Sequence, residues 1–354
     1  MAQAVTTVVS SELAPRTTNP ARAVRVGLVG VTLIVALAAV GVLALMLGVT
    51  EIPPREVLTI VFTEGGARVP RIVIWEVRLP RFLLGALAGA SLAAAGTMLQ
   101  DALKNELASP GLLGVATGAS LVVAVIVIFN IAVPFGTRPL FALAGGLTAG
   151  ITILFVTRLT KDPVRMILIG AALSAFFSAM ITIVVVLGEP EEIRALYSYL
   201  VGSVIGRDWD DLLLALPWIA VGLPIALLFG RPLNLLQLGD DMAEGLGLPV
   251  FRTRAVIFAV AIVLQAAVVA VCGPIGFVAL VAPHMTRGLL QTTDARQVLP
   301  ISALVGALLL TISDVVAREL FSPAELPVGL LTTVIGAPFA LVLLRRLITR
   351  KAHG

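Results

Sequence analysis

The residues with which most enzymes and metal sites do their chemistry are scarce in this chain. It has one cysteine, Cys272, so neither an internal disulfide nor a cysteine metal cluster can form. Its two histidines are His284, which follows Pro283, and His353 in the last residues of the sequence. A metal site needs several convergent ligands, and a lone histidine does not supply them. We therefore predict neither a metal site nor catalytic residues.

The motifs that would supply energy for transport are also missing. None of the three lysines, Lys104, Lys161 and Lys351, follows a glycine, so the G-x-x-x-x-G-K-[ST] loop that cradles nucleotide phosphates is absent. Acidic side chains do not pair within the apolar segments as a proton or sodium relay requires. The only candidate, Asp314, precedes Arg318 by one helical turn, a spacing that favours a local ion pair. If this protein moves a solute uphill, we expect the motor on another chain, and we predict that this chain is not an enzyme.

The composition places most of the chain in a membrane. Of its 354 residues, 58% are hydrophobic and only 13% are charged, whereas soluble domains carry about 25% charged residues. A spanning helix needs about 20 mainly apolar residues. Uncharged runs near this length occur at 26–50, 82–100, 107–137, 139–157, 166–188, 212–230, 255–286, 297–313 and 326–344. We predict an all-α, polytopic membrane protein with about ten transmembrane helices, comprising a disordered cytoplasmic tail at 1–25 and one transmembrane domain at 26–354 in contact with the lipid bilayer.

The run 255–286 contains an interruption. It is too long for one crossing and too short for two, and it holds Gly273-Pro274-Ile275-Gly276, which a continuous helix does not tolerate. Arg287 follows Gly276 by only about three helical turns. Placing Gly276 at the outer surface would therefore put Arg287 deep in the hydrocarbon, at a cost of about 2.5–3.5 kcal/mol. We expect the interruption to be submerged and packed inside protein, and the following span to be short and tilted.

The basic residues predict the orientation. Cytoplasmic loops of membrane proteins carry an excess of Lys and Arg. With ten spans and the N-terminus inside, more than half of the 25 basic residues fall on the cytoplasmic side. Both termini are then cytoplasmic, and the acid-rich loop 189–211 is outside. This arrangement accounts for the net charge of +4 without a nucleic-acid partner.

A polar segment at 231–254, RPLNLLQLGDDMAEGLGLPVFRTR, lies between two spans on the predicted cytoplasmic side. Residues 240–246 have the pattern of a short amphipathic helix that ends at Gly247, with Asp240 and Asp241 in the first turn, where the helix dipole favours acids. A simple linker does not need such a helix. We therefore expect this segment to receive force from a partner.

Four stretches of the sequence resemble a known family. They are RLPRFLLGALAGASLAAAGTMLQ (78–100) with NELASPGLLGVATGAS (105–120), RPLNLLQLGDDMAEGLGLP (231–249), GPIGFVALVAPHMTR (273–287) and the closing segment 314–346. They resemble the permeases of iron-siderophore, haem and cobalamin ABC importers, the type II importer fold. The resemblance implies a second permease subunit, two cytoplasmic ATPase subunits that hold ATP and Mg²⁺, and an extracytoplasmic substrate-binding protein. It implies no cofactor on this chain and a place in the bacterial plasma (inner) membrane.

The resemblance also implies three sets of functional residues. The segment expected to contact the ATPase contains Gly239, Asp240, Asp241, Glu244, Gly245, Leu246 and Gly247. The loops expected to form the cytoplasmic gate contain Asn105, Glu106, Leu107, Asp162, Pro163 and Val164. The family commonly has Asn-Pro-Leu-Ala where this chain has Glu106 in place of the proline, which leaves the shape of the gate open. Arg78, Arg81 and Arg318 fall on the outer side, where basic residues are depleted, and are expected to form an exposed rim that docks acidic residues of the binding protein.

We therefore predict the permease subunit of a binding-protein-dependent ABC importer for an iron chelate. A ferric siderophore ranks ahead of haem or cobalamin because that branch is the commonest. The alternative is an ion-coupled secondary transporter, which fits the missing nucleotide motif but not the lack of intramembrane acids or of an internal repeat. An intramembrane enzyme has no supporting residues. Whether the second permease is a copy of this chain or a sister chain stays open.

Overall fold

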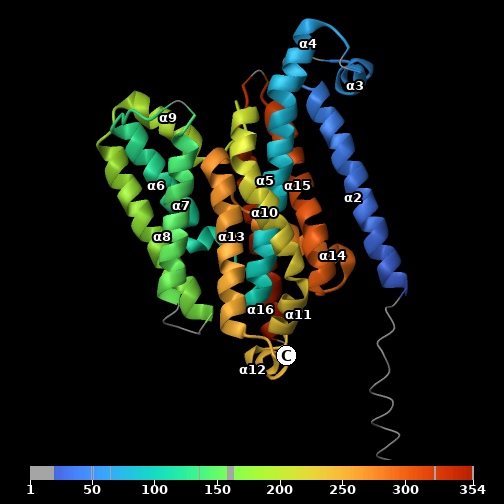
Figure 1. Ribbon diagram of the computed structural model, residues 1–354, viewed down its shortest axis with the longest axis vertical. Helices are drawn as coiled ribbons and strands as arrows, with labels where there is room; N and C mark the ends of the chain where they lie inside the picture. The colour runs from blue at the N-terminus through green and yellow to red at the C-terminus, as the bar shows by residue number, and fades with distance from the viewer. Residues whose placement is uncertain are drawn as a thin grey trace, which may run out of the picture.

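The computed structural model describes residues 20–352 except 49, 51, 64, 135, 158–162 and 323, and every regular element in this part of the chain is helical (Figure 1). The predicted all-α class is confirmed. Most of the tail expected at 1–25, residues 1–19, lies outside the described residues. From Pro20 the chain is already helical in α2 (Pro20–Met46), which begins six residues before the expected transmembrane domain.

Within the described residues, eight helices are long and apolar enough to cross a membrane. They are α2, the continuous stack of α4 (Arg68–Ile72), η1 (Val73–Arg78) and α5 (Leu79–Ala102), and then α7 (Arg138–Thr157), α8 (Pro163–Val186), α10 (Trp209–Leu228), α13 (Val250–Cys272), α15 (Ala295–Glu319) and α16 (Val328–Ala352). Two shorter helices, α6 (Val115–Ile128) and α14 (Val278–Leu290), account for the remaining predicted crossings. With 13 residues, α14 is as short as the interrupted sequence predicts.

The bundle is built around α5, α13 and α15. The apolar windows of these helices are 78%, 78% and 67% buried, whereas those of α2, α7, α8, α10 and α16 are at most 33% buried. Helices associate in lipid through small residues and interhelical hydrogen bonds, because lipid provides no hydrophobic driving force between them. At the contact of α5 with α15, a Cβ on Gly89 would overlap the carbonyl group of Gly306. Nearby, the Thr97 hydroxyl donates to that of Ser302 at 2.9 Å.

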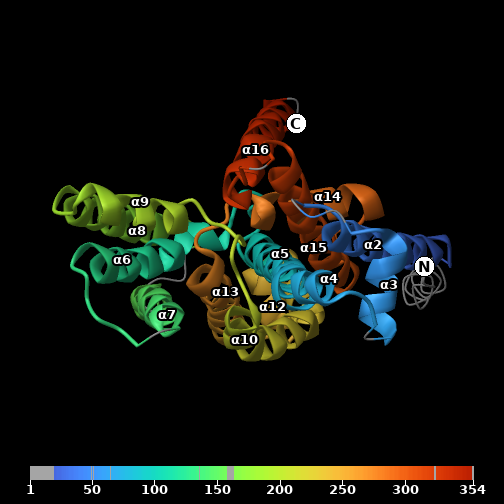
Figure 2. The same ribbon diagram turned by 90° about the horizontal axis from the view of Figure 1, so that it is seen from above.

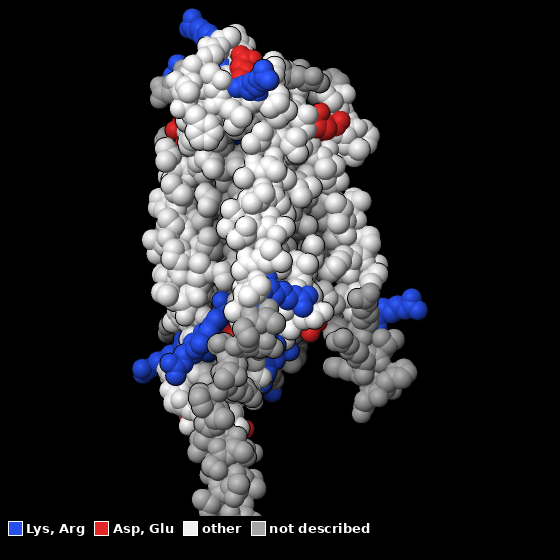
Figure 3. Space-filling model, turned by 90° about the vertical axis from the view of Figure 1, so that its right-hand side faces the viewer, with Lys and Arg blue, Asp and Glu red and all other residues white. Residues whose placement is uncertain are grey.

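Short helices cover the two ends of the bundle (Figure 1). One end, called here the α9 end, carries α3 (Pro54–Thr63), α4 and α9 (Pro190–Leu200). The opposite α12 end carries α11 (Gly230–Gln237) and α12 (Asp240–Gly245). Figure 3 shows a belt of uncharged surface between charged ends, the distribution expected of a protein that spans a bilayer. Seen from above, α6 to α9 form a group at one side, and α16 projects from the centre at another (Figure 2).

The interruption after α13 is packed against two other segments of the chain. The Ser203 N–H donates to the Cys272 carbonyl at 2.7 Å, and the Gly329 N–H donates to the Gly202 carbonyl at 3.0 Å. Gly273 has a φ of 70°, which only glycine adopts readily. The end of α13, the turn after α9 and the start of α16 therefore meet backbone to backbone. This contact, the glycine junction of Gly202, Gly273 and Gly329, confirms that the interruption is packed inside protein, as irregular backbone in a membrane must be.

Candidate functional site

Charged side chains from distant parts of the chain meet at the α9 end. Arg81 of α5 donates to both carboxylate oxygens of Asp314 in α15, with distances of 2.8–3.2 Å, and its Nη1 donates to Glu325 at 2.7 Å. Arg81 and Asp314 are both buried. The planar guanidinium fork matches a carboxylate, and the pairing compensates for removing both charges from water. This contact ties α5 to α15 and to the segment that precedes α16.

Arg78 and Arg318 bind main-chain carbonyls around the end of α2. Arg78 donates through Nη1 to Leu45 at 2.7 Å and through Nη2 to Thr50 at 2.5 Å. Arg318 donates through Nη2 to Ala44 at 2.9 Å. The last carbonyls of a helix lack intrahelical partners, so the two arginines supply donors to the carbonyls of Ala44 and Leu45 in the last turn of α2. Arg78 is also the last residue of η1, a π-helical turn of a kind that is frequent at functional sites.

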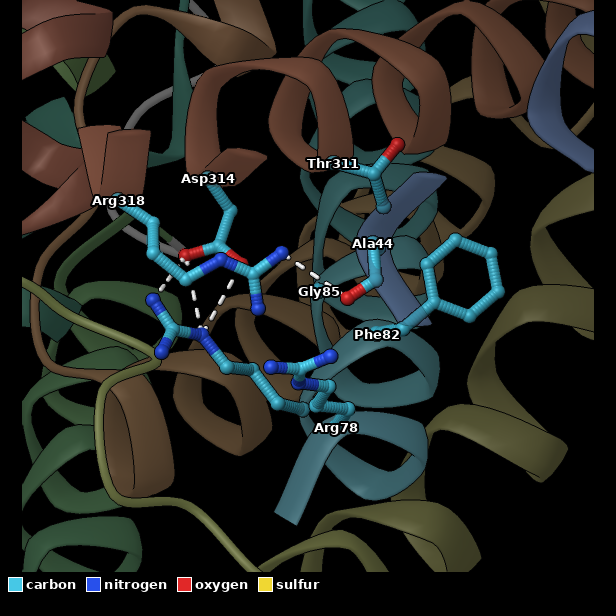
Figure 4. A pocket seen from close by; sticks show the side chains of 8 residues that line it. Ala44, Arg78, Phe82, Gly85, Thr311, Asp314 and Arg318 are labelled. Atoms are coloured by element: carbon cyan, nitrogen blue, oxygen red, sulfur yellow. Dashed lines mark hydrogen bonds and ion pairs between the residues drawn. The ribbon is translucent and has the colours of Figure 1, made fainter. Parts of the chain in front are cut away.

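The buried positions of these arginines correct the expectation of an exposed rim. Arg78, Arg81 and Arg318 are only 5–6% exposed. Figure 4 shows Arg78, Asp314 and Arg318 converging between α5 and α15. The expected local ion pair between Asp314 and Arg318 is also wrong, because Asp314 is engaged by Arg81 from another helix. The acceptors on α2, α15 and the segment before α16 lie within reach of the guanidinium groups and draw them inward. The Nε of Arg318 stays buried without a hydrogen-bond partner.

The segment at the α12 end contains the short helix that the sequence predicts. Beyond the last turn of α12, the Gly247 N–H donates to Glu244 and the Leu248 N–H donates to Ala243, both at 2.9 Å. Gly247 has a φ of 84°, the left-handed conformation typical of the residue that ends a helix. Ala243 is buried beneath the helix and holds it against the bundle.

The outer surface of this segment is exposed and partly apolar. Five of the residues expected to contact an ATPase are exposed: Asp241, Glu244, Gly245, Leu246 and Gly247. The other two, Gly239 and Asp240, are half-buried. Leu238, Met242 and Leu246 are 57–60% exposed. Apolar side chains at a charged end of the molecule, outside the apolar belt, are typical of a protein interface.

Arg254, at the start of α13, joins α12 to the interior of the bundle. Its Nη1 and Nη2 each donate to a carboxylate oxygen of Asp240 at 2.7 Å, and its Nε donates to the carbonyl of Ala102 at 3.1 Å. The Lys104 ammonium lies 3.8 Å from the same carboxylate. The hydrogen bonds from Arg254 lower the pKa of Asp240 below its ordinary value. One buried guanidinium thus connects α12, α13 and the last residue of α5.

The other helix of this segment is anchored separately. The Asn234 side chain of α11 donates to the Asp294 carboxylate at 2.6 Å and accepts from the Ala295 N–H at 2.7 Å. Asp294 is the residue that caps the start of α15. Both helices at the α12 end are therefore attached to central spans, α11 to α15 and α12 to α5 and α13.

The predicted gate loop begins directly after α5. The Asn105 side chain accepts a hydrogen bond from the Leu107 N–H at 2.9 Å, which forms a tight local turn. Glu106 is exposed, and its carboxylate lies 3.7 Å from Nδ1 of His284 in α14. The glutamate that replaces the family's usual proline therefore faces a histidine on a neighbouring helix.

Arg287 fixes the same end of α5 from the side of α14. It donates to the Gln100 side chain at 2.6 Å and to Asp101 at 2.9 Å. Arg287, whose expected depth in the membrane was the reason to place the interruption inside protein, is thus paired with Asp101. Of the second predicted gate loop, Asp162 lies outside the described residues, and Pro163 and Val164 are the first residues of α8. The structure therefore describes one half of the predicted gate.

Comparison with known proteins places this helical bundle in a family. Residues 33–346 match the FecCD transport family. The chain belongs to this family. It is 41% identical over 312 residues to the Fe(3+) dicitrate transport system permease protein FecD of Escherichia coli (strain K12), a match that covers 88% of this chain and 96% of that protein. It is 38% identical over 313 residues to the iron(3+)-hydroxamate import system permease protein FhuG of Bacillus subtilis (strain 168), covering 86% and 92%.

A solved structure shares the fold. It is described as an inward-facing conformation of a metal-chelate type ABC transporter, and it superposes with a TM-score of 0.79 at 29% identity, covering 90% of this chain and 98% of that chain. This agreement confirms the type II importer permease fold that the four sequence stretches predict.

In this FecCD family member, two arginines that join helices of the bundle, Arg254 and Arg287, are not among the site residues predicted from the sequence. Arg254 was expected only as a basic residue that flanks a span, and Arg287 only as a limit on the depth of the interruption. A signal was present, because an arginine close to the hydrocarbon needs an internal partner. The partners, Asp240 and Asp101, could not be read from the sequence. Among the described residues, no group of three or more His, Cys, Asp or Glu side chains is arranged to hold a metal ion.

Proposed function

We propose that this FecCD family member is the permease subunit of an ABC importer that carries a ferric chelate. The proposal depends on two features of α12 and its flanking residues. Leu238, Met242 and Leu246 are exposed on its outer side, and Asp240 is bound to Arg254 inside the bundle. A helix that is exposed on one side and anchored on the other can take up force from a partner and pass it to the spans. ATP hydrolysis is assigned to separate ATPase subunits that dock on α12. The cargoes in the names of FecD and FhuG, iron(3+) dicitrate and iron(3+)-hydroxamate, support a ferric chelate as the solute.

The α12 end is assigned to the cytoplasm, together with both termini, and the membrane to the bacterial plasma membrane. Exposed basic residues outnumber exposed acids among the described residues of the α12 end, as the distribution of charge in membrane proteins requires of a cytoplasmic face. They are Arg22, Arg25, Lys104, Arg165, Arg231, Arg252, Arg296 and Arg345, against Glu106, Asp241 and Glu244. At the α9 end, exposed arginines are matched by acids such as Glu189, Glu191, Asp208 and Asp210.

A second permease subunit is assigned to the side of α8 and α16. The apolar windows of these two helices are only 11% and 28% buried. Helix α8 packs against the chain segment that follows the predicted gate loop, since a Cβ on Gly170 of α8 would overlap the carbonyl of Leu112. Gly329 and Leu330 of α16 line a cavity together with Gly111 of the same segment. A second subunit, either a copy of this chain or a sister chain, would close a central pathway between them.

The extracytoplasmic binding protein is assigned to the α9 end, above the arginines. The Nε of Arg318 lacks a hydrogen-bond partner, and its contact with the Glu319 carboxylate is long, at 3.8 Å, so an incoming carboxylate could replace that contact. Glu325, which is more exposed than Asp314, could exchange its contact with Arg81 for a partner's carboxylate. These two features support a docking role for the cluster even though its arginines do not form an exposed rim.

The proposal is tested by reconstitution with candidate ATPase and binding-protein subunits from the same organism. Proteoliposomes should take up ferric citrate or a ferric hydroxamate only with ATP inside, and haem and cobalamin are tested in parallel. Replacing Leu238, Met242 and Leu246 together with serine should prevent the ATPase from co-purifying. Uptake that needs an ion gradient and no ATPase would replace the proposal with the secondary transporter.

A further inference from the structure

A groove of about 410 Å³ runs along the bundle between the end of α9 and the start of α16. Its upper rim is formed by Val201 and by Gly329 of the glycine junction. Its lower rim is formed by Gly111, in the 3-10 turn η2 (Pro110–Leu113), and by Ala116 at the start of α6. The groove therefore extends from the turn that follows the predicted gate loop to the junction near the α9 end.

One buried polar side chain that lines this groove has an oxygen without a hydrogen-bond partner. Gln265, in the middle of the buried helix α13, is 3% exposed, and its Oε1 has no hydrogen-bond partner. An unpaired amide oxygen is costly in a membrane interior, where water is absent and every polar group must be satisfied within the protein or by a bound molecule. The other side chains on the groove include Leu200, Ile275 and Leu330, which offer this oxygen no donor.

The surroundings of Gln265 suit transient contact and not tight binding. None of the residues that line the groove carries a charge, so a chelate of either sign is neither trapped nor repelled. The Thr333 hydroxyl on the α16 wall already donates to the Gly329 carbonyl at 2.7 Å. Conduction requires contacts that are favourable enough to admit a solute and weak enough to release it. A single neutral amide on an otherwise apolar wall meets both conditions.

We propose that Gln265 contacts the solute as it passes through the groove, and that the solute class it favours is an oxygen-rich ferric chelate. The Gln265 Nε2 can donate to the carboxylate or carbonyl oxygens that surround iron in citrate and hydroxamate chelates, and the unpaired Oε1 can accept from a hydroxyl or N–H group elsewhere on the chelate. This inference rests on the proposed function, because a second permease subunit against α8 and α16 is needed to close the groove into a pathway.

The experiment uses the complete transporter, reconstituted with its ATPase and binding protein. Gln265→Leu keeps the size of the side chain and removes the amide. Gln297→Leu is the matched control, because the Gln297 Oε1 is likewise buried and unpartnered but Gln297 does not line the groove. We expect Gln265→Leu to lower the ferric citrate transported per ATP hydrolysed by about fivefold, the effect of one hydrogen bond. Gln297→Leu should match the wild type.

A second variant tests the chemistry of the contact. Gln265→Glu places a carboxylate in the groove and should reduce uptake of anionic ferric citrate more than uptake of a neutral ferric hydroxamate. The thermal unfolding midpoint of each complex separates contact with the solute from a role in packing. The assignment of Gln265 is wrong if Gln265→Leu transports like the wild type. It is also wrong if the loss of transport is accompanied by a lower thermal unfolding midpoint that Gln297→Leu does not show, because the loss then reflects packing. If the wild type itself takes up no ferric chelate, the proposed function fails and takes this inference with it.

Discussion

Arg254 and Asp240 form a paired hydrogen bond, in which Nη1 and Nη2 of the guanidinium each lie 2.7 Å from a carboxylate oxygen. The same guanidinium donates through Nε to Ala102, the last residue of α5. Because α5 leads directly into the predicted gate loop, a displacement of α12 can reach that loop through one side chain. Arg254 is therefore a positioning residue in the proposed coupling.

Replacing Asp240 with Asn should weaken this link by about 1.5–3 kcal/mol, the usual contribution of hydrogen bonds to charged groups. We expect the reconstituted transporter to move less chelate per ATP hydrolysed, while the ATPase still co-purifies. Asp241→Asn is the matched control, because it removes the neighbouring acid, which is exposed. An equal loss of coupling in both variants would contradict the role of the Arg254–Asp240 pair.

The same pair should be insensitive to pH over the physiological range. Hydrogen bonding by Arg254 lowers the pKa of Asp240 below 3.8, so its contribution to stability is present above that value and is lost as the pH falls through the lower pKa of the folded state. A fluorescent label on Gly245→Cys should show constant mobility from neutral pH down to about pH 4. Cys272 is buried, which confines labelling to the new thiol. Mobility that rises already between pH 7 and pH 5 would show that another group anchors α12.

Gly247→Val should disrupt the end of α12. Gly247 has a φ of 84°, and a β-branched residue in this region costs roughly 1–3 kcal/mol. Gly245→Val adds the same side chain in equally open space but at an ordinary φ. We expect uptake per ATP to fall further for Gly247→Val than for Gly245→Val. Equal losses of uptake in the two variants would show that the added side-chain volume at the ATPase contact, and not the φ of Gly247, causes the effect.

Arg81→Glu should remove most of the folded protein. The new carboxylate would lie beside Asp314 and Glu325, and breaking a buried ion pair costs about 3–5 kcal/mol. Arg81→Lys keeps the charge without the planar fork, so the protein should fold with a lower thermal unfolding midpoint. Arg55→Glu, an exposed position on α3, controls for surface charge at the same end.

The folded Arg81→Lys variant also tests docking. If the cluster receives carboxylates of the binding protein, association should slow at low salt, where steering by charge is strongest. Stopped-flow or surface-binding kinetics would measure the rate. A wild-type association rate would leave the arginines with a structural role alone.

Cysteines at Leu107 should cross-link two permease subunits if the second subunit is a copy of this chain. Leu107 follows Glu106, whose carboxylate faces His284 at 3.7 Å, so this loop is held next to α14 at the proposed cytoplasmic end. The disulfide should form when the pathway is closed toward the cytoplasm and not when it is open. Cross-linking that is independent of the nucleotide state would remove Leu107 from the gate.

The sequence by itself determined the architecture of this protein. The lengths of apolar runs predict the spans, because bilayer thickness imposes one length scale on every crossing. The interruption at Gly273 and Pro274 and the short helix ended by Gly247 were also readable, since both depend on backbone preferences of the residues themselves. Four stretches with the family's residue pattern then indicated the permeases of iron-siderophore, haem and cobalamin ABC importers.

Only the tertiary structure decided which partners the charged side chains contact. Arg81 and Asp314 are 233 residues apart, and nothing in either segment indicates that α5 and α15 pack side by side. A guanidinium near the end of a span binds whichever acceptor the neighbouring helix presents, so Arg78 and Arg318 turn inward although local charge rules place them on a rim. The environment of Gln265 was likewise decided by tertiary structure, because in the sequence it is simply a glutamine within an apolar run. The packing of α9, α13 and α16 leaves it at a groove with an unpaired oxygen, because helix contacts in lipid are set by the shapes of facing surfaces.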